Sequence, residues 1–277
     1  MKLKSKVIGS DCKISVNGIS ICYDDFGTGN IPIIFIHGFP FDKSTWRKQM
    51  DYFNANYRVI SYDIRGFGKS TSNKEIHSID LYADDLIEFM DVLKIEKAII
   101  CGLSMGGYIT MNAVCRFPGR FQAVILCDTQ CIDDTPEIKL KRSQTISQIK
   151  AGKVKLFADN FVNSIFSTQT LESKTELVEE IRSLIYGTSA AAIIGALNAI
   201  AQRDEVCNEL KALTLPVLIL CGEDDLLTPP SQSEIINAMI LNSKLEMIDH
   251  AGHLSNLEKP NDFNLKIANF VLGLKGM

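Results

Sequence analysis

The sequence of 277 residues predicts an α/β fold: a doubly wound, mostly parallel sheet with an inserted block of helices. One observation is that short, unbroken apolar runs alternate with segments whose apolar residues recur at helical spacing. Unbroken apolar strands are typical of a parallel sheet that is covered on both faces. A second observation is that this alternation stops after residue 128 and returns near residue 217. Strands and helices in alternation indicate right-handed crossovers and therefore a doubly wound sheet.

The first half of the chain contains most of the predicted sheet. Residues 13–23 are expected to form two short antiparallel strands around the turn residues Asn17 and Gly18. Four apolar runs predict the next strands, over residues 31–36, 58–62, 97–101 and 123–127. Helical spacing predicts two helices, over residues 79–93 and 105–117. Ser78 is the expected N-cap of the first of them.

Beyond residue 128, helical patterns predict four consecutive helices, over residues 136–151, 154–165, 171–186 and 190–202. Strands return at residues 217–221 and 244–248, and a last helix is predicted over residues 260–272. We interpret the helical block as a cap over the carboxyl edge of the sheet. The chain then divides into a first core segment of residues 1–132, a cap of residues 133–211 and a second core segment of residues 212–277.

The charge balance limits the kinds of partner. The 29 basic and 33 acidic side chains give a formal net charge of −4, which argues against nucleic acid or an anionic membrane as the main partner. No apolar run approaches the roughly 18 residues of a membrane helix. Residues 1–10 contain lysines, but no apolar region follows them, so no signal peptide is predicted. We therefore expect a cytoplasmic monomer or homodimer that acts on a small molecule.

The cysteines and the lack of an export signal together predict a redox state. Without an export signal, the eight cysteines are expected to be reduced and mostly buried thiols. Cys127 and Cys131 stand too far from other ligand residues in the sequence to indicate a zinc site. We expect neither a metal nor a cofactor.

Residues 102–106 carry the candidate nucleophile, because they match the pattern G-x-S-x-G between a predicted strand and a predicted helix. A turn this tight leaves no room for a Cβ atom at the flanking positions, which explains the glycines. It would expose Ser104 at the edge of the sheet, above the start of the helix. The alternative is a glycine-rich turn with an inert serine.

A serine hydroxyl is a poor nucleophile near neutral pH, so it needs a base beside it. The chain has four histidines. His77 lies in a polar loop, and His37 is better explained as a structural residue. His250 and His253 both follow the last strand and could both reach Ser104, and their spacing does not separate them.

The orienting acid should also follow a strand. Asp224 and Asp225 follow the run at 217–221, and Asp128 follows the run at 123–127, so either position would serve. The chain order of serine, aspartate and histidine is the one expected of nucleophile-elbow hydrolases.

The loop that begins at His37 is the fourth candidate element. Its Phe39 N–H and the Met105 N–H at the helix start could both point at a substrate oxyanion and favour the tetrahedral intermediate. The ring of His37 is expected to brace this loop. Asp63 and Arg65 are expected to hold the turn beneath it through hydrogen bonds.

Together these motifs resemble the α/β-hydrolase fold enzymes of the esterase and lactonase branch. The segments that carry the resemblance follow the family's order, at residues 37–40, 63–70, 102–107, 222–229 and 250–253. In that family the acid stands three residues after the glycine of a G-x-x-D-x-x-x-P turn, which implies Asp225. The base is the second histidine of an H-x-G-H loop, which implies His253, and Asp128 becomes the fallback acid.

The resemblance implies a serine hydrolase that cleaves an ester or lactone of a small, largely apolar substrate. Residues 190–204 are similar to the cap-to-core return of 3-oxoadipate enol-lactonases and related small esterases. A substrate carboxylate would need a cation such as Arg182 or Arg203. Candidate substrate contacts are Phe39, Trp46, Phe157 and Phe161, although aromatic residues in a cap are more often part of its core.

Other activities stay open on the same fold. The serine at the nucleophile position disfavours the related dehalogenases and epoxide hydrolases, which place an aspartate there. Carbon–carbon bond hydrolases and perhydrolases use the same triad, and a transferase is possible if the cap excludes water. A different class of function would be a catalytically inert ligand-binding protein. The presence of all four catalytic elements argues against that last alternative.

Overall fold

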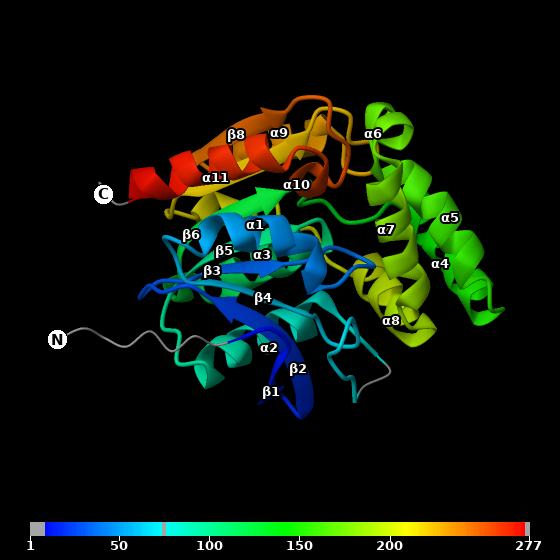
Figure 1. Ribbon diagram of the computed structural model, residues 1–277, viewed down its shortest axis with the longest axis horizontal. Helices are drawn as coiled ribbons and strands as arrows, with labels where there is room; N and C mark the ends of the chain where they lie inside the picture. Colours follow the sequence, from blue (N-terminus) through cyan, green and yellow to red (C-terminus); the bar gives the residue numbers. More distant parts are fainter. Residues whose placement is uncertain (1–8, 74–75, 275–277) are drawn as a thin grey trace.

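The computed structural model describes residues 9–73 and 76–274 and confirms the predicted fold class (Figure 1). Its core is an eight-stranded sheet with the order β1-β2-β4-β3-β5-β6-β7-β8. β1 and β2 pair antiparallel with their neighbours, and all other pairs are parallel. The strands are β1 (Cys12–Val16), β2 (Ile19–Phe26), β3 (Ile33–Ile36), β4 (Val59–Tyr62), β5 (Ala98–Leu103), β6 (Phe121–Cys127), β7 (Val217–Gly222) and β8 (Ser243–Ile248).

Both faces of the sheet are covered, which is why its strands are apolar without alternation. In β3, Ile34 and Ile36 belong to one apolar cluster, and Ile33 and Phe35 belong to the other. Helices α2 (Ile79–Val92), α3 (Met105–Arg116) and α9 (Pro230–Met239) pack in the first cluster. Helices α1 (Arg47–Phe53), α10 (Ser255–Glu258) and α11 (Pro260–Gly273) pack in the second.

Turn residues and helix caps in the sequence indicated where most strands end and most helices begin. Asn17 and Gly18 form the turn between β1 and β2 with positive φ values of 45° and 76°. The hydroxyl of Ser78 accepts a hydrogen bond from the N–H of Leu81 at 3.0 Å and caps α2 as expected. The short helices α1 and α9 were not anticipated. The prediction that residues 1–10 do not begin a signal peptide falls mostly on residues outside the described part of the chain.

Five helices are inserted between β6 and β7, and they lie together beyond one end of the sheet (Figure 1). They are α4 (Pro136–Lys150), α5 (Val154–Ile165), α6 (Thr168–Ser173), α7 (Thr175–Gly187) and α8 (Ala190–Ala201). The single helix expected over residues 171–186 is wrong, because the chain leaves the helical conformation at Lys174 (φ −124°, ψ 51°). There the Lys174 ammonium donates a hydrogen bond to the backbone carbonyl of Glu258 in the core, a tertiary contact that no local pattern contains.

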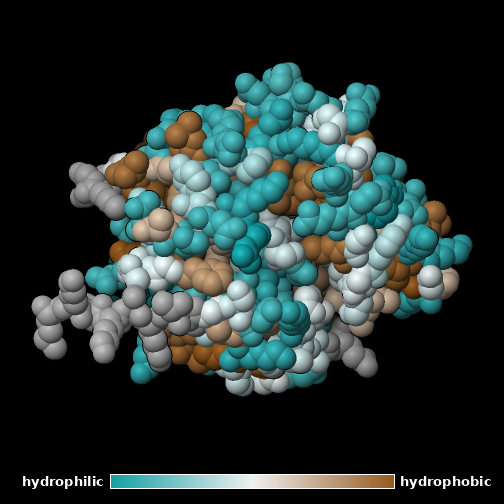
Figure 2. Space-filling view, viewed as in Figure 1, coloured by the Kyte–Doolittle hydropathy of each residue, from teal (hydrophilic) through white to brown (hydrophobic). Residues whose placement is uncertain are grey.

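Within residues 9–73 and 76–274, no single helix is long and apolar enough to cross a membrane. Helices α7 and α8 reach the required length and composition only when taken together, and they meet at 96°. Figure 2 shows hydrophobic residues interspersed among hydrophilic ones on one face of the molecule.

A disulfide joins the two ends of the insertion, so the expectation that all eight cysteines are reduced is wrong. Cys131 precedes α4 and Cys207 follows α8, and their Cα atoms lie 5.0 Å apart, a separation typical of disulfides. The Val206 N–H donates to the Cys131 carbonyl at 2.9 Å and holds the two segments together. The pair is separated by 76 residues, so spacing in the sequence gave no sign of it. The other six cysteines are free.

Removing this disulfide should destabilise the protein. We expect the double variant Cys131→Ala, Cys207→Ala to lose about 2–5 kcal/mol of unfolding free energy, because the crosslink closes a long loop. Urea denaturation of the oxidised proteins measures the loss. Cys115→Ala, which removes a free thiol, should cost about 1 kcal/mol or less. Equal denaturation midpoints for the double variant and the wild type would contradict the prediction.

Candidate active site

The candidate residues follow five neighbouring strands at the carboxyl edge of the sheet. Phe39 follows β3, Ser104 follows β5, Asp128 follows β6, Asp225 follows β7 and His253 follows β8. These strands are parallel neighbours, so their carboxyl ends meet at one edge. The topology therefore gathers side chains that lie far apart in the sequence.

Ser104 sits on a strained turn between β5 and α3. Its backbone has φ 54° and ψ −113°, a conformation that costs free energy in any residue with a side chain. The surroundings hold this conformation. The Ser104 N–H donates to the Cys127 carbonyl at 2.9 Å, and the Ser104 carbonyl accepts from the Thr129 hydroxyl at 2.9 Å. Only 7% of Ser104 is exposed, so water has little access to it.

The glycines of the G-x-S-x-G pattern are required by close packing. A Cβ atom on Gly102 would lie 2.3 Å from the carbonyl oxygen of Gly106. A Cβ atom on Gly106 would lie 2.3 Å from the carbonyl oxygen of Ile36 in β3. Both distances are far below van der Waals contact. The structure therefore confirms that these two positions have no room for a Cβ atom.

The structure separates the two histidines that spacing left open. His253 is fully buried, and its Nδ1 lies 2.8 Å from Oδ2 of Asp225. His250 is exposed. Because Nδ1 is paired with a carboxylate, Nε2 is the ring atom available to accept a proton.

Asp225 is held rigidly beneath this ring. Its Oδ1 accepts hydrogen bonds from the N–H groups of Leu227 (2.8 Å) and Thr228 (3.1 Å), and its Oδ2 accepts from the Thr228 hydroxyl (2.8 Å). Burial opposes the negative charge, but the attraction of His253 and these hydrogen bonds outweigh it and lower the pKa of Asp225. Asp225 therefore stays ionised.

The electrostatics of His253 favour the protonated ring. Burial by itself lowers the pKa of His253, but the carboxylate of Asp225, helped by Asp128 and Glu258, raises it above the usual value. Its Nε2 is buried and has no hydrogen-bond partner among the described residues. The hydrogen bond expected between Ser104 and His253 is therefore not formed in this structure. Catalytic hydrogen bonds of this kind often tighten only when substrate binds.

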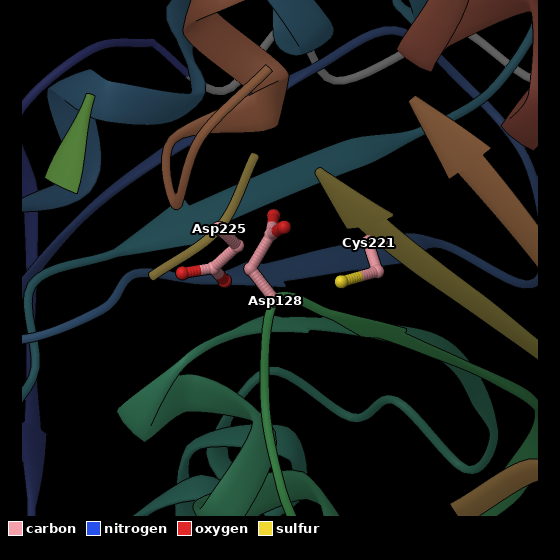
Figure 3. Close-up of side chains that lie close together, drawn as sticks. All are labelled: Asp128, Cys221 and Asp225. Atoms are coloured by element: carbon pink, nitrogen blue, oxygen red, sulfur yellow. The ribbon is translucent and has the colours of Figure 1, made fainter. Parts of the chain in front are cut away.

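Asp128, the fallback acid, has other partners. Its Oδ1 accepts from the Gly222 N–H at 2.7 Å, and its Oδ2 lies 2.5 Å from the Ser255 hydroxyl. Burial and the nearby charge of Asp225 raise the pKa of Asp128 well above its usual value. One potential ligand atom from each of Asp128, Cys221 and Asp225 lies within 4.8 Å of the other two, and Figure 3 shows the three side chains next to one another. Protein donors already occupy the carboxyl oxygens, so we assign no metal to this cluster.

The loop at residues 37–40, the candidate oxyanion loop, lies directly against Ser104. A Cβ atom on Gly38 would lie 3.3 Å from Cβ of Ser104, so the loop leaves little space beside it. Phe39 follows in this loop, and Met105 is the first residue of α3. The first N–H groups of a helix have no acceptor within the helix, so the Met105 N–H is available to a ligand.

His37 braces the oxyanion loop, as expected from the sequence. Its Nδ1 lies 2.9 Å from the Gly38 carbonyl, and its Nε2 accepts from the Ile64 N–H at 3.0 Å. Burial lowers the pKa of His37 to about 4, so the ring is neutral. Beneath the loop, the carboxyl group of Asp63 accepts from the N–H groups of Lys43 (2.9 Å) and Lys69 (2.8 Å).

Two of the candidate substrate contacts pack on the oxyanion loop. Phe157 and Phe161 of α5 are partly buried, and their ring centroids lie 6.0 and 5.8 Å from the ring of Phe39. The prediction that Trp46 lines the entrance is wrong. Trp46 is fully buried and packs between Phe35 (5.0 Å) and Phe263 (6.1 Å), because α1 places it in the core between the sheet and α11.

The two arginines considered for a substrate carboxylate are already paired with carboxylates of the protein. Arg182 lies 2.8 Å from Asp159, and Arg203 lies 2.8 Å from Asp134. Arg203 also stacks over the ring of Tyr108 at 4.4 Å. Arg182 also pairs with Glu179 and is compensated, whereas Arg203 shares Asp134 with Arg142, and its buried Nε has no hydrogen-bond partner among the described residues.

Sequence reasoning missed the role of Thr228. Its hydroxyl bonds to Asp225 and lies 3.2 Å from Nδ1 of His253, so it contacts both residues. A signal was present, because Thr228 stands three residues after Asp225 in the G-x-x-D-x-x-x-P turn. A hydroxyl at this spacing can fold back onto the aspartate.

Comparisons with known proteins agree with this fold. A profile of the alpha/beta hydrolase fold matches residues 31–260. The chain is 29% identical to 3-oxoadipate enol-lactonase 2 of Acinetobacter baylyi, over 91% of this chain and 92% of that protein. The structure of a thermophilic esterase from Thermogutta terrifontis superposes with a TM-score of 0.91 at 29% identity, covering 95% and 98% of the two chains. An enol-lactonase from Burkholderia xenovorans superposes with a TM-score of 0.88 at 27% identity, covering 94% and 100%.

Proposed function

Because the chain belongs to the α/β-hydrolase fold family, we propose that it is a serine hydrolase that cleaves a carboxylic ester or lactone. The observation that carries the proposal is the buried pair of His253 and Asp225, 2.8 Å apart. This pair follows β7 and β8 at the edge of the sheet where Ser104 stands on its strained turn.

In the proposed mechanism, His253 Nε2 takes the proton of Ser104 as the serine oxygen attacks the carbonyl carbon. Asp225 holds the imidazole in the correct tautomer and stabilises the imidazolium. The N–H groups of Phe39 and Met105 stabilise the oxyanion. His253 then gives its proton to the leaving alcohol, and an acyl-enzyme remains. Water activated by His253 attacks the acyl-enzyme, and the acid and free Ser104 are released.

We propose that residues 133–211 act as a cap whose α5 forms one wall of the substrate site. The contacts of Phe157 and Phe161 with Phe39 support this role, because they place apolar rings against the oxyanion loop. The pairing of Arg182 with Asp159 and Glu179 argues against Arg182 as the partner of a substrate carboxylate. The similarity to two enol-lactonases makes a lactone the natural second substrate class to test.

The first test measures hydrolysis of p-nitrophenyl esters of graded acyl length by the wild type and by Ser104→Ala. We expect the wild type to turn over the short, apolar esters and Ser104→Ala to lose activity by several orders of magnitude. A fluorophosphonate should add to the wild type once, at Ser104, as measured by intact mass.

Equal turnover by both proteins would contradict the role of Ser104. If the wild type neither hydrolyses esters and lactones nor reacts with the fluorophosphonate, the chain is an inert binding protein on this fold. Reaction with the fluorophosphonate without ester or lactone hydrolysis would instead point to carbon–carbon bond cleavage or perhydrolysis on the same residues.

A further inference from the structure

A buried carboxylate joins the loop that carries His253 to the inserted helices. Glu258 is the last residue of α10, and its side chain is fully buried. Its Oε1 accepts a hydrogen bond from the N–H of Gly252, the residue before His253, at 2.9 Å. Its Oε2 accepts two hydrogen bonds from Ser167, one from the N–H at 3.0 Å and one from the hydroxyl at 2.8 Å. Ser167 lies between α5 and α6, so one carboxylate bridges the core and the insertion.

The backbones of the two segments also touch directly. The His253 N–H donates to the carbonyl of Ile165, the last residue of α5, at 2.8 Å. Gly252 approaches so closely that a Cβ atom there would lie 2.6 Å from the nitrogen of Ser167. The histidine loop therefore rests on the insertion and not only on the sheet from which it emerges.

The charge of Glu258 makes this contact sensitive to movement. Three hydrogen bonds compensate the buried carboxylate directly, and the positive charge of Lys174, which bonds to the Glu258 backbone carbonyl, adds to them. A buried charge is costly without such bonds. If Ser167 moved away, Oε2 would lose both of its donors inside the protein. We therefore expect that a displacement of the insertion also disorders the loop that carries His253.

We propose that Glu258 is a positioning residue that couples the docking of the insertion to the alignment of the base. The proposal rests on the proposed function, because it takes His253 as the base. With the insertion docked, Glu258 fixes Gly252 and thereby holds the ring of His253 against Asp225. With the insertion displaced, the loop loosens and the ring loses that alignment. The site is then fully active only when the insertion covers it.

The test compares Glu258→Gln with the wild type on a p-nitrophenyl ester over a range of pH. The amide keeps the shape but places an NH2 group where one oxygen accepted an N–H, so at least one bond is lost. We expect kcat to fall by about 10- to 100-fold, because small displacements of catalytic groups cost this much. We also expect the acid limb of kcat/KM to move to lower pH, because contact with Asp225 and the charge of Glu258 itself both raise the pKa of His253.

Ser167→Ala separates alignment from a simple change of charge. It keeps the Glu258 carboxylate and its bond to Gly252 and removes the Ser167 hydroxyl, which bonds to Glu258, lies 3.3 Å from the His250 carbonyl and caps α6 by accepting from the Thr170 N–H. We expect a fall in kcat of about three- to tenfold, the effect of one or two hydrogen bonds, with the pH midpoint moved in the same direction. If Glu258→Gln does not fold, this variant decides the question. An unaltered profile in folded Ser167→Ala would then overturn the proposal.

Asp25→Asn is the matched control, because it also neutralises a buried carboxylate, one paired with Arg58 at 2.7 Å on β2. It should lower Tm without moving the pH midpoint. Glu258→Gln with wild-type kcat, or with a lower Tm and an unmoved midpoint like Asp25→Asn, would overturn the positioning role. If the positioning role fails in this way but turnover by the wild type depends on Ser104, the proposed hydrolase function still stands. If turnover by the wild type does not depend on Ser104, the proposed function and the positioning role are both wrong.

Discussion

Replacing His253 with alanine is expected to lower kcat for a p-nitrophenyl ester by about 10⁴- to 10⁶-fold, the loss seen when a triad histidine is removed. The reason is that a serine hydroxyl is almost fully protonated near neutral pH and needs a base to attack. His253 is buried, paired through Nδ1 with Asp225, and has a free Nε2. Steady-state kinetics with active-site titration measures the loss.

His250→Ala is the matched control for this experiment. His250 lies three residues earlier in the same loop but is exposed, so kcat should stay within a few-fold of the wild type. The backbone of His250 has a positive φ of 54°, so circular dichroism should establish that the loop variant is folded. The base would have to be reassigned if His250→Ala lost the activity and His253→Ala kept it.

Replacing Asp225 with asparagine is expected to lower kcat by about 10⁴-fold. An amide can donate to Nδ1 and so stabilise the wrong tautomer of His253, and it cannot stabilise the imidazolium. The change is nearly isosteric, and Oδ1 can still accept from the Leu227 and Thr228 N–H groups. The fold should therefore survive, and a thermal melt alongside the kinetics checks this.

Asp128→Asn provides the contrast, because it removes the other carboxyl group of the buried cluster in Figure 3. Burial raises the pKa of Asp128 and so disfavours its charge, and asparagine at this position can accept from the Gly222 N–H and donate to the Ser255 hydroxyl oxygen. We expect Asp128→Asn to keep kcat within about tenfold of the wild type. A larger loss in Asp128→Asn than in Asp225→Asn would mean that the acid follows β6 and not β7.

The insertion is held by a crosslink between its two ends and by hydrogen bonds to the core near α6, which bears on how it could move. At its two chain ends, the Cys131–Cys207 disulfide ties residues that precede α4 and follow α8. Near α6, Ser167 is bound to Glu258 and the Ile165 carbonyl is bound to the His253 N–H. A displacement that breaks the second attachment while the first holds would act directly on the histidine loop.

Much of the fold could be predicted from the sequence because its causes are local. A strand buried on both faces needs an unbroken apolar run, and residues 33–36 in β3 show this. A tight turn from strand to helix needs glycines, and the packing of Gly102 and Gly106 shows why. Capping by Ser78 depends on a residue only three positions away. The candidate nucleophile and the oxyanion loop were found in the same way.

The remaining features depend on contacts between residues far apart in the chain. Spacing could not choose between His250 and His253, because the choice depends on which ring meets Asp225, 28 residues away from His253. Composition indicated reduced cysteines, whereas folding brings Cys131 and Cys207 together across 76 residues.

The sequence by itself therefore determined the order of the strands and of the longer core helices, the tight turn of Ser104 and the set of polar residues at the ends of strands. Only the tertiary structure decided which of those residues pair, that Trp46 belongs to the core, and that Arg182 and Arg203 pair with acidic residues of the protein. The physical reason is that backbone conformation follows from neighbours along the chain, whereas hydrogen bonds, ion pairs and burial follow from neighbours in space.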